Sequence, residues 1–191
     1  MKAIEILKNF VEEKLSTEEL EMALSSNQEL ISLLESTKAK PYMNSNSTYE
    51  YLISQDLTSL DSKLNLMDIF REILDYKHIP YSSNSTTEKK FDLILGAIPN
   101  WIPADMGYLN FLYDKYKPKT ATTLKKIIKE HFICMDKYPK WLQEPDWPIV
   151  DNIPAMFLGQ LDITKLKHDT TYLYIFWDKK LDRYIEIIQS L

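Results

Sequence analysis

The sequence predicts an α+β fold, with a helical N-terminal two-thirds and a small antiparallel C-terminal β-sheet. Two changes along the chain lead to this prediction. Up to about residue 137 the apolar residues recur at helical spacing, whereas from about residue 156 they alternate with a period of two. Between the two parts, Tyr138–Ile163 holds four of the nine prolines, through which no helix can run. We therefore expect this segment to be an irregular hinge between the helical part and the β part.

Residues 1–36 predict three short helices. An apolar stripe marks the first, and the capping boxes Ser16–Glu19 and Ser26–Glu29 begin the second and third. The pattern ends near Ser36, where a stretch rich in Ser, Asn and Pro begins. We therefore expect residues 1–36 to form a short acidic appendage and residues 37–191 to form the main domain.

The main domain carries the remaining helices. Ser47 caps a short helix through Ile53, and Asn65 begins a strongly amphipathic one that Pro80 stops. Cap and proline signals mark three more, which begin near Ser85, Pro103 and Thr120. The apolar stripe of the last helix runs through His131 to Met135.

Three strands follow, and they are predicted at Met156–Ile163, Tyr172–Trp177 and Arg183–Ile188. Asp178, Lys179 and Lys180 form the turn between the last two. Because Tyr172–Trp177 is apolar on both faces, we expect both of its sides to be covered.

Composition excludes several classes of protein. Three glycines leave no room for a glycine-rich phosphate loop, and a single cysteine leaves no disulfide or cysteine-based zinc site. No apolar run is long enough for a membrane span, and the N-terminus lacks the apolar core of a signal peptide. A cytoplasmic protein is therefore expected. Its net charge of −5 argues against a nucleic-acid partner.

The negative charge gathers in residues 1–36, which hold eight Glu and three Lys. One interpretation is a solvated helix face. The other is an acidic surface for a basic protein partner, formed by Glu12, Glu13, Glu18 and Glu19.

The search for chemistry finds no catalytic residue, metal site or cofactor site. His131, Cys134 and Asp136 lie close in sequence, but they fall on one apolar helix, where we expect Cys134 to be buried and inert. The three histidines are far apart and lack the spacing of metal ligands.

The aromatic residues give a second set of candidates. Trp141 and Phe157 are expected in the core, on either side of the hinge. Trp101 and Trp147 are candidate anchors for a partner, with Trp147 the one expected to be partly exposed.

The segment from Pro139 to Ile163 resembles the bacterial YwqG-like group. The resemblance rests on Pro139, Trp141, Gln143, Trp147, Pro148, Pro154, Phe157, Gly159, Gln160 and Asp162, and on the aromatic strand Tyr172–Asp178. It covers about a quarter of the chain. The group carries over no catalytic residue, and some of its members are thought to act as immunity proteins.

We therefore expect a non-enzymatic bacterial protein that binds another protein, most specifically an immunity protein that occludes a basic toxin domain. The alternative is a small-molecule ligand-binding domain or hydrolase. A pocket at the helix–sheet junction, lined by Gln143, Gln160 and Asp162, would favour that alternative. The sequence does not determine an oligomeric state.

Overall fold

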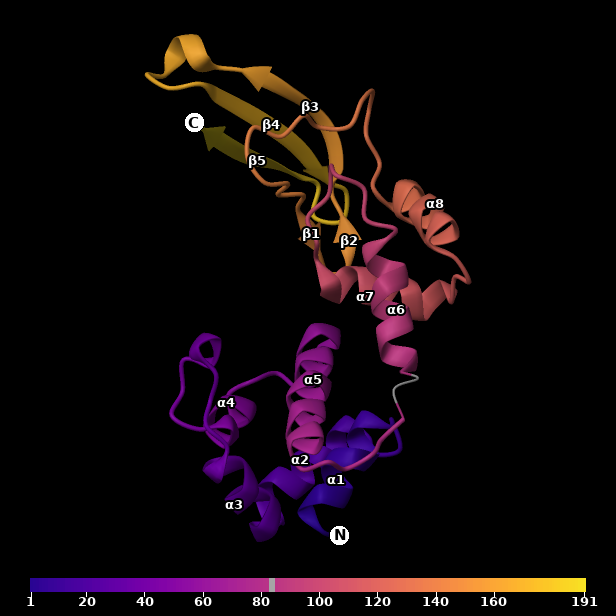
Figure 1. The fold of residues 1–191 in the computed structure, drawn as a ribbon. Helices are drawn as coiled ribbons and strands as arrows, with labels where there is room; N and C mark the ends of the chain where they lie inside the picture. Colours follow the sequence, from indigo (N-terminus) through magenta and orange to yellow (C-terminus); the bar gives the residue numbers. More distant parts are fainter. Residues whose placement is uncertain (83–84) are drawn as a thin grey trace. The chain divides into compact units, whose positions relative to one another are not determined.

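The computed structural model describes residues 1–82 and 85–191. These residues form eight α-helices followed by a small antiparallel sheet at the end of the chain, which confirms the predicted α+β class (Figure 1). The chain divides into two compact units, Met1–Asp92 and Leu93–Leu191. The boundary between them falls within helix α6.

The first unit is entirely helical among its described residues. In chain order it contains α1 (Ala3–Val11), α2 (Thr17–Ser26), α3 (Gln28–Ser36), the 3-10 turn η1 (Pro41–Met43), α4 (Thr48–Ile53), α5 (Leu60–Tyr76) and most of α6 (Thr86–Leu95). The predicted caps of α2 and α4 are present, because the side chains of Ser16 and Ser47 each accept a backbone hydrogen bond there. Helix α3 is capped by Asn27 and not by the predicted Ser26, which is the last residue of α2.

Helix α5 is the centre of this unit. Helix α1 packs on it, and the Phe10 ring meets the Phe70 ring edge-on with 5.5 Å between centroids. Leu20 of α2 and Leu34 of α3 are fully buried in the same apolar cluster. The chain therefore does not divide after residue 36 as the sequence suggested. Helices this short bury too little surface to be stable alone, and they share the core of α5 instead.

Two helix boundaries differ from the prediction. Helix α5 begins five residues before Asn65, because the Ser59 hydroxyl accepts from the Ser62 amide and caps it there. Helix α8 ends at His131 rather than continuing to Met135. The next residues are extended and pair with the first strand of the sheet, where Phe157 exchanges backbone hydrogen bonds of 2.9 Å with Ile133 and Met135.

The second unit combines two helices and two small sheets. Its elements are α7 (Met106–Tyr116), α8 (Ala121–His131), β1 (Ile149–Val150), β2 (Ile153–Pro154), β3 (Met156–Asp162), the 3-10 turn η2 (Thr164–Leu166), β4 (Thr171–Asp178) and β5 (Arg183–Ser190). Strands β1 and β2 form a hairpin, and the main sheet has the antiparallel order β3-β4-β5. Its three strands lie close to where the sequence predicts them.

The core of the second unit is aromatic. Phe157, Phe176 and Trp147 are buried with their ring centroids 5.1–6.0 Å apart. The hinge segment closes over this core, since the half-buried Trp141 ring packs on Tyr174 and Phe176. Among the described residues, no helix is both long and apolar enough to cross a bilayer.

Candidate protein-binding surface

The main sheet has two faces of different character. Residues opposite each other in an antiparallel ladder share a face, and neighbours along a strand alternate between faces. Tyr174 and Phe176 of β4 therefore point to one side, where both are fully buried. Leu173, Ile175 and Trp177 point to the other side, and all three are only half-buried.

The pairing of β4 with its neighbours shows which residues of β3, of β5 and of the segment after α8 lie on this second face. We call this second face the open sheet face. It consists of Ile133, Met135, Met156, Gly159, Leu161, Leu173, Ile175, Trp177, Tyr184, Glu186 and Ile188. The set includes one charged side chain, Glu186. Five of its apolar side chains expose more than half of their surface, namely Ile133, Met135, Leu161, Tyr184 and Ile188.

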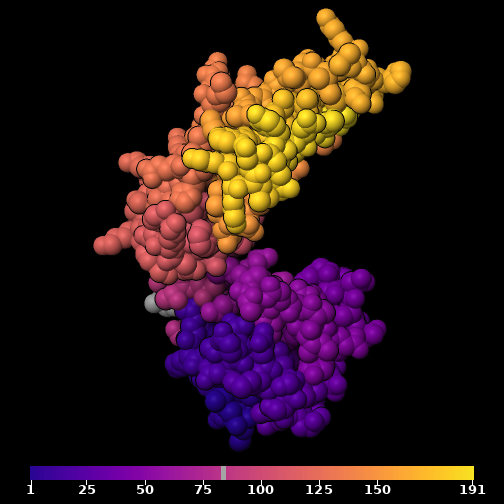
Figure 2. All heavy atoms as spheres, turned by 180° about the vertical axis from the view of Figure 1, so that it is seen from behind, coloured from indigo at the N-terminus to yellow at the C-terminus, as the bar shows by residue number. Residues whose placement is uncertain are grey.

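This finding corrects the expectation that both sides of Tyr172–Trp177 are covered. The hinge segment and its tryptophans cover one side, and the other side is left with partly exposed apolar side chains. Figure 2 shows the last strand, in yellow, lying at the surface of the molecule. A cluster of exposed apolar side chains on a soluble domain is typical of an interaction site.

Gly159 lies near the middle of this face, opposite Ile175. A Cβ placed on Gly159 would meet no atom within 4 Å, so the space above this residue is empty. Its φ is not positive, and the backbone therefore does not require glycine here. The pairing shifts between Phe157 and Gly159, so a β-bulge precedes it. A glycine inside a strand is typical of a bulge and of a place that another chain approaches closely.

A groove of about 820 Å³ lies at the end of the sheet where Met156 and Trp177 are paired. Its other walls come from α7, α8 and the β1–β2 hairpin, including Phe111, Tyr116 and Ile153. The groove and the open sheet face share Ile133, Met156 and Trp177, so they form one continuous surface.

His131 lies in the wall of this groove. Its Nδ1 and Nε2 atoms are each 2.9 Å from a tyrosine hydroxyl, of Tyr108 and Tyr116 respectively. Burial lowers the pKa of His131, and the nearby Lys115 ammonium lowers it further. The imidazole is therefore neutral at neutral pH, with one nitrogen donating and the other accepting.

His131 and Cys134 do not form a nucleophile pair, as expected from the sequence. Both ring nitrogens of His131 are bonded to tyrosines, and Cys134 lies beyond the end of α8 in the extended segment beside β3. Burial raises the pKa of the Cys134 thiol, and the charge of Asp136 raises it further, so the thiolate is disfavoured. Cys134 is half-buried rather than fully buried. Among the described residues, no three potential metal ligands gather.

The acidic residues of the N-terminal helices contact their own unit. Glu12 accepts hydrogen bonds from the Ser82 amide and the Lys14 ammonium, and its side chain is only 7% exposed. Glu13 binds the start of α6, and Glu19 accepts from the Ser16 amide in the capping box of α2. Glu18 and Glu19 are exposed. Three of the four residues of the expected acidic surface, Glu12, Glu13 and Glu19, therefore accept hydrogen bonds within their own unit.

The two candidate tryptophan anchors belong to the core. Trp147 is 3% exposed and donates from Nε1 to the Ala155 carbonyl at 2.8 Å, so the expectation that it is partly exposed is wrong. Trp101 is half-buried and stacks on Tyr138 with 3.8 Å between ring centroids. Both rings pack on other aromatic side chains, Trp101 on Tyr138 and Trp147 on Phe132.

The three residues expected at the helix–sheet junction make hydrogen bonds within the second unit. Gln160 accepts from the Lys140 amide at 2.7 Å, and Gln143 donates to the Ser190 carbonyl at 2.6 Å. Asp162 is exposed and accepts from the Thr164 amide at the end of β3. The two glutamines thus hold the hinge segment to β3 and β5.

Neither a protein-family model, nor a curated protein, nor a solved structure matches this chain. The functional surface therefore has to be argued from the structure itself. Sequence reasoning missed the open sheet face although its signal was present. The apolar residues on both faces of β4 were interpreted as two buried sides, whereas one of them is the exposed surface.

Proposed function

We propose that this chain binds another protein through the open sheet face, and that it is a cytoplasmic, non-enzymatic immunity protein that occludes a toxin domain. One observation carries the proposal of a protein partner. A strand with two apolar faces keeps one of them half-exposed, next to other exposed apolar side chains, and a partner surface would bury them. The role of immunity protein is favoured by the resemblance of the hinge segment and the following strand to the YwqG-like group.

The chemistry of the face indicates what the partner presents. Its apolar side chains need an apolar surface of similar extent, and aromatic residues such as Trp177 and Tyr184 are frequent anchors of protein interfaces. Glu186 lies among them, across from Ile175. A carboxylate covered by a partner requires a cation there, which agrees with a basic toxin domain.

The test uses the toxin candidates encoded beside this chain. Each is expressed with and without the full-length chain, and both growth and binding by calorimetry of the purified pair are measured. The wild-type chain restores growth and binds one of them. Leu161→Lys and Ile188→Lys each weaken that binding by about 2 kcal/mol or more, roughly thirtyfold in Kd.

Leu166→Lys is the matched control, because Leu166 is 80% exposed but lies in η2, outside the open sheet face. It binds as the wild type does. The proposal fails if no neighbouring product is bound, or if the two face variants bind as tightly as Leu166→Lys. A stable homodimer that Ile188→Lys separates would also contradict it, since a second copy would then cover the face.

A further inference from the structure

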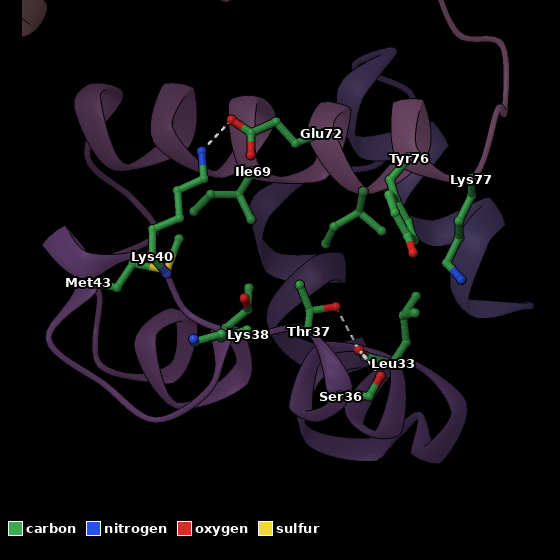
Figure 3. Close-up of a pocket in the computed structure, with 12 residues that line it drawn as sticks. Leu33, Ser36, Thr37, Lys38, Lys40, Met43, Ile69, Glu72, Tyr76 and Lys77 are labelled. Atoms are coloured by element: carbon green, nitrogen blue, oxygen red, sulfur yellow. Dashed lines mark hydrogen bonds and ion pairs between the residues drawn. The ribbon is translucent and has the colours of Figure 1, made fainter.

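A second site lies in the first unit, in a pocket of about 470 Å³ between α3, α5 and the segment that joins α3 to α4 (Figure 3). Pockets that bind small molecules have volumes in this range and combine apolar walls with a few polar groups. Apolar side chains line this pocket from three elements, namely Leu33 of α3, Met43 of η1, and Ile69 and Ile73 of α5. The pocket therefore accommodates an apolar body.

Its charged residues are mainly cations. Three lysines and one glutamate line the pocket, namely Lys38, Lys40, Lys77 and Glu72. The surrounding unit is acidic, since residues 1–92 contain ten Lys and Arg against sixteen Asp and Glu, a net charge of −6. A local excess of lysine in such a unit marks a place suited to an anion.

The three lysines differ in whether they form an ion pair. Lys40 forms an ion pair with Glu72, whereas neither Lys38 nor Lys77 has an ion-pair partner among the described residues. Figure 3 shows Tyr76 and Lys77 together at one end of the pocket, with the Lys40–Glu72 pair at the other. The Tyr76–Lys77 end therefore offers an available ammonium group beside a phenol hydroxyl.

Two hydroxyl groups of the pocket already have hydrogen-bond partners. The Ser36 and Thr37 hydroxyls both donate to the Leu33 carbonyl, at 2.8 and 2.9 Å. They do not provide the ring of donors that a strongly hydrated anion such as phosphate requires. The favoured anion is one whose charge stays at the rim while an apolar chain enters the pocket.

From this arrangement we propose that the pocket binds a small organic monocarboxylate with an apolar chain. The chain lies between Leu33 and Ile73, and the carboxylate lies at the rim beside Lys77 and the Tyr76 hydroxyl. This site is separate from the protein-binding role, because all of its residues belong to the first unit and the open sheet face belongs to the second.

The experiment is calorimetric titration of the full-length protein with octanoate, and with octanol as the uncharged probe of the same chain length. Octanoate binds saturably at one site, more tightly than octanol, and its affinity falls as salt is added. Lys77→Gln weakens the affinity for octanoate by about fivefold, which is the upper range for one partly exposed ion pair. The same variant leaves the affinity for octanol unchanged.

Two further variants complete the test. Lys63→Gln removes a lysine charge from α5 outside the pocket, whereas Lys77 follows the end of that helix, and the Lys63→Gln variant binds octanoate as the wild type does. Leu33→Trp fills the pocket from α3 and abolishes binding of both probes, with the fold checked by circular dichroism. The proposal is overturned if octanoate does not saturate the wild type, if octanol binds equally well, or if the two lysine variants behave alike. Ile188→Lys, in the other unit, retains octanoate binding, so this site and the protein-binding surface can fail separately.

Discussion

At the scale of single residues, Glu13 links two distant parts of the first unit. It follows α1 with a left-handed backbone (φ 56°), and its carboxylate accepts hydrogen bonds from the Thr86 and Thr87 amides and from the Ser85 hydroxyl. These donors lie at the start of α6, where the helix dipole also favours an anion. A residue expected to meet a partner is instead part of the fold.

This arrangement makes the stability of the protein depend on pH. Burial raises the pKa of Glu13, but the hydrogen bonds from Thr86 and Thr87 outweigh it and lower the pKa from 4.5 to about 2. A lowered folded-state pKa stabilises the fold above the unfolded value and is lost as the pH falls. Glu13→Gln should cost about 1 kcal/mol at neutral pH, and its difference from the wild type should shrink between 4.5 and about 2.

Urea unfolding followed by circular dichroism across that pH range measures the effect. Glu21→Gln is the control, because Glu21 is exposed on α2 and lies away from α6 in sequence. A constant difference between Glu13→Gln and the wild type down to the lowest pH would show that the charge of Glu13 contributes nothing.

Trp147 gives a second prediction at this scale. Its ring contacts Phe132, Phe157 and Phe176, and its Nε1 donates to the Ala155 carbonyl. Trp147→Ala should lower the free energy of unfolding by about 3–5 kcal/mol through the cavity it leaves. Trp147→Phe keeps most of the packing but loses the hydrogen bond, at a cost of about 1–3 kcal/mol. Equal stability of the two variants, measured by urea unfolding, would contradict this account.

At the scale of elements, β5 distinguishes the two faces of the sheet. Ile187 faces the core side, opposite Tyr174, whereas Ile188 faces the open side, opposite Leu173. Ile188→Lys should change the free energy of unfolding by less than about 0.5 kcal/mol, because the side chain is already half-exposed. Ile187→Lys should cost more than about 1 kcal/mol, because it places a charge against the aromatic core. Thermal melts of the two variants compare them directly, and equal losses would mean that the open face is also needed for folding.

The elements also show what local sequence determines. Caps such as Ser16, Ser47 and Thr120 act within one helical turn, so they predict helix starts correctly. The end of α8 depends instead on a contact with β3, more than twenty residues away, which overrides the apolar stripe through Met135. The aromatic and aliphatic residues of β4 predict a strand, but they do not determine which of its faces the hinge segment covers.

At the scale of the whole molecule, the two units have separate cores, and different spectroscopic probes report on them. All four tryptophans lie in residues 93–191, whereas five helices, α1 to α5, lie in the first unit. Leu7 is fully buried in the core of the first unit. Leu7→Ala should therefore destabilise that unit by about 2–5 kcal/mol.

Denaturation followed by two probes tests this independence. In the Leu7→Ala variant, the circular dichroism transition moves to lower urea, and the tryptophan emission transition stays where it is in the wild type. If both transitions move together, the two units unfold cooperatively as one, and this prediction is wrong.

Gly159 has a consequence for how this sequence tolerates variation. A side chain at this position would meet no other atom within 4 Å and the φ angle is not positive, so the packing of the chain does not require glycine here. In a library of variants selected only for folding, valine or threonine at position 159 should therefore be enriched, because β-branched residues favour strands. Under the proposed function, in which a toxin domain covers the open sheet face, selection of the same library for growth in the presence of that toxin should retain glycine. Comparing the two selections position by position would outline the partner's footprint without a structure of the complex.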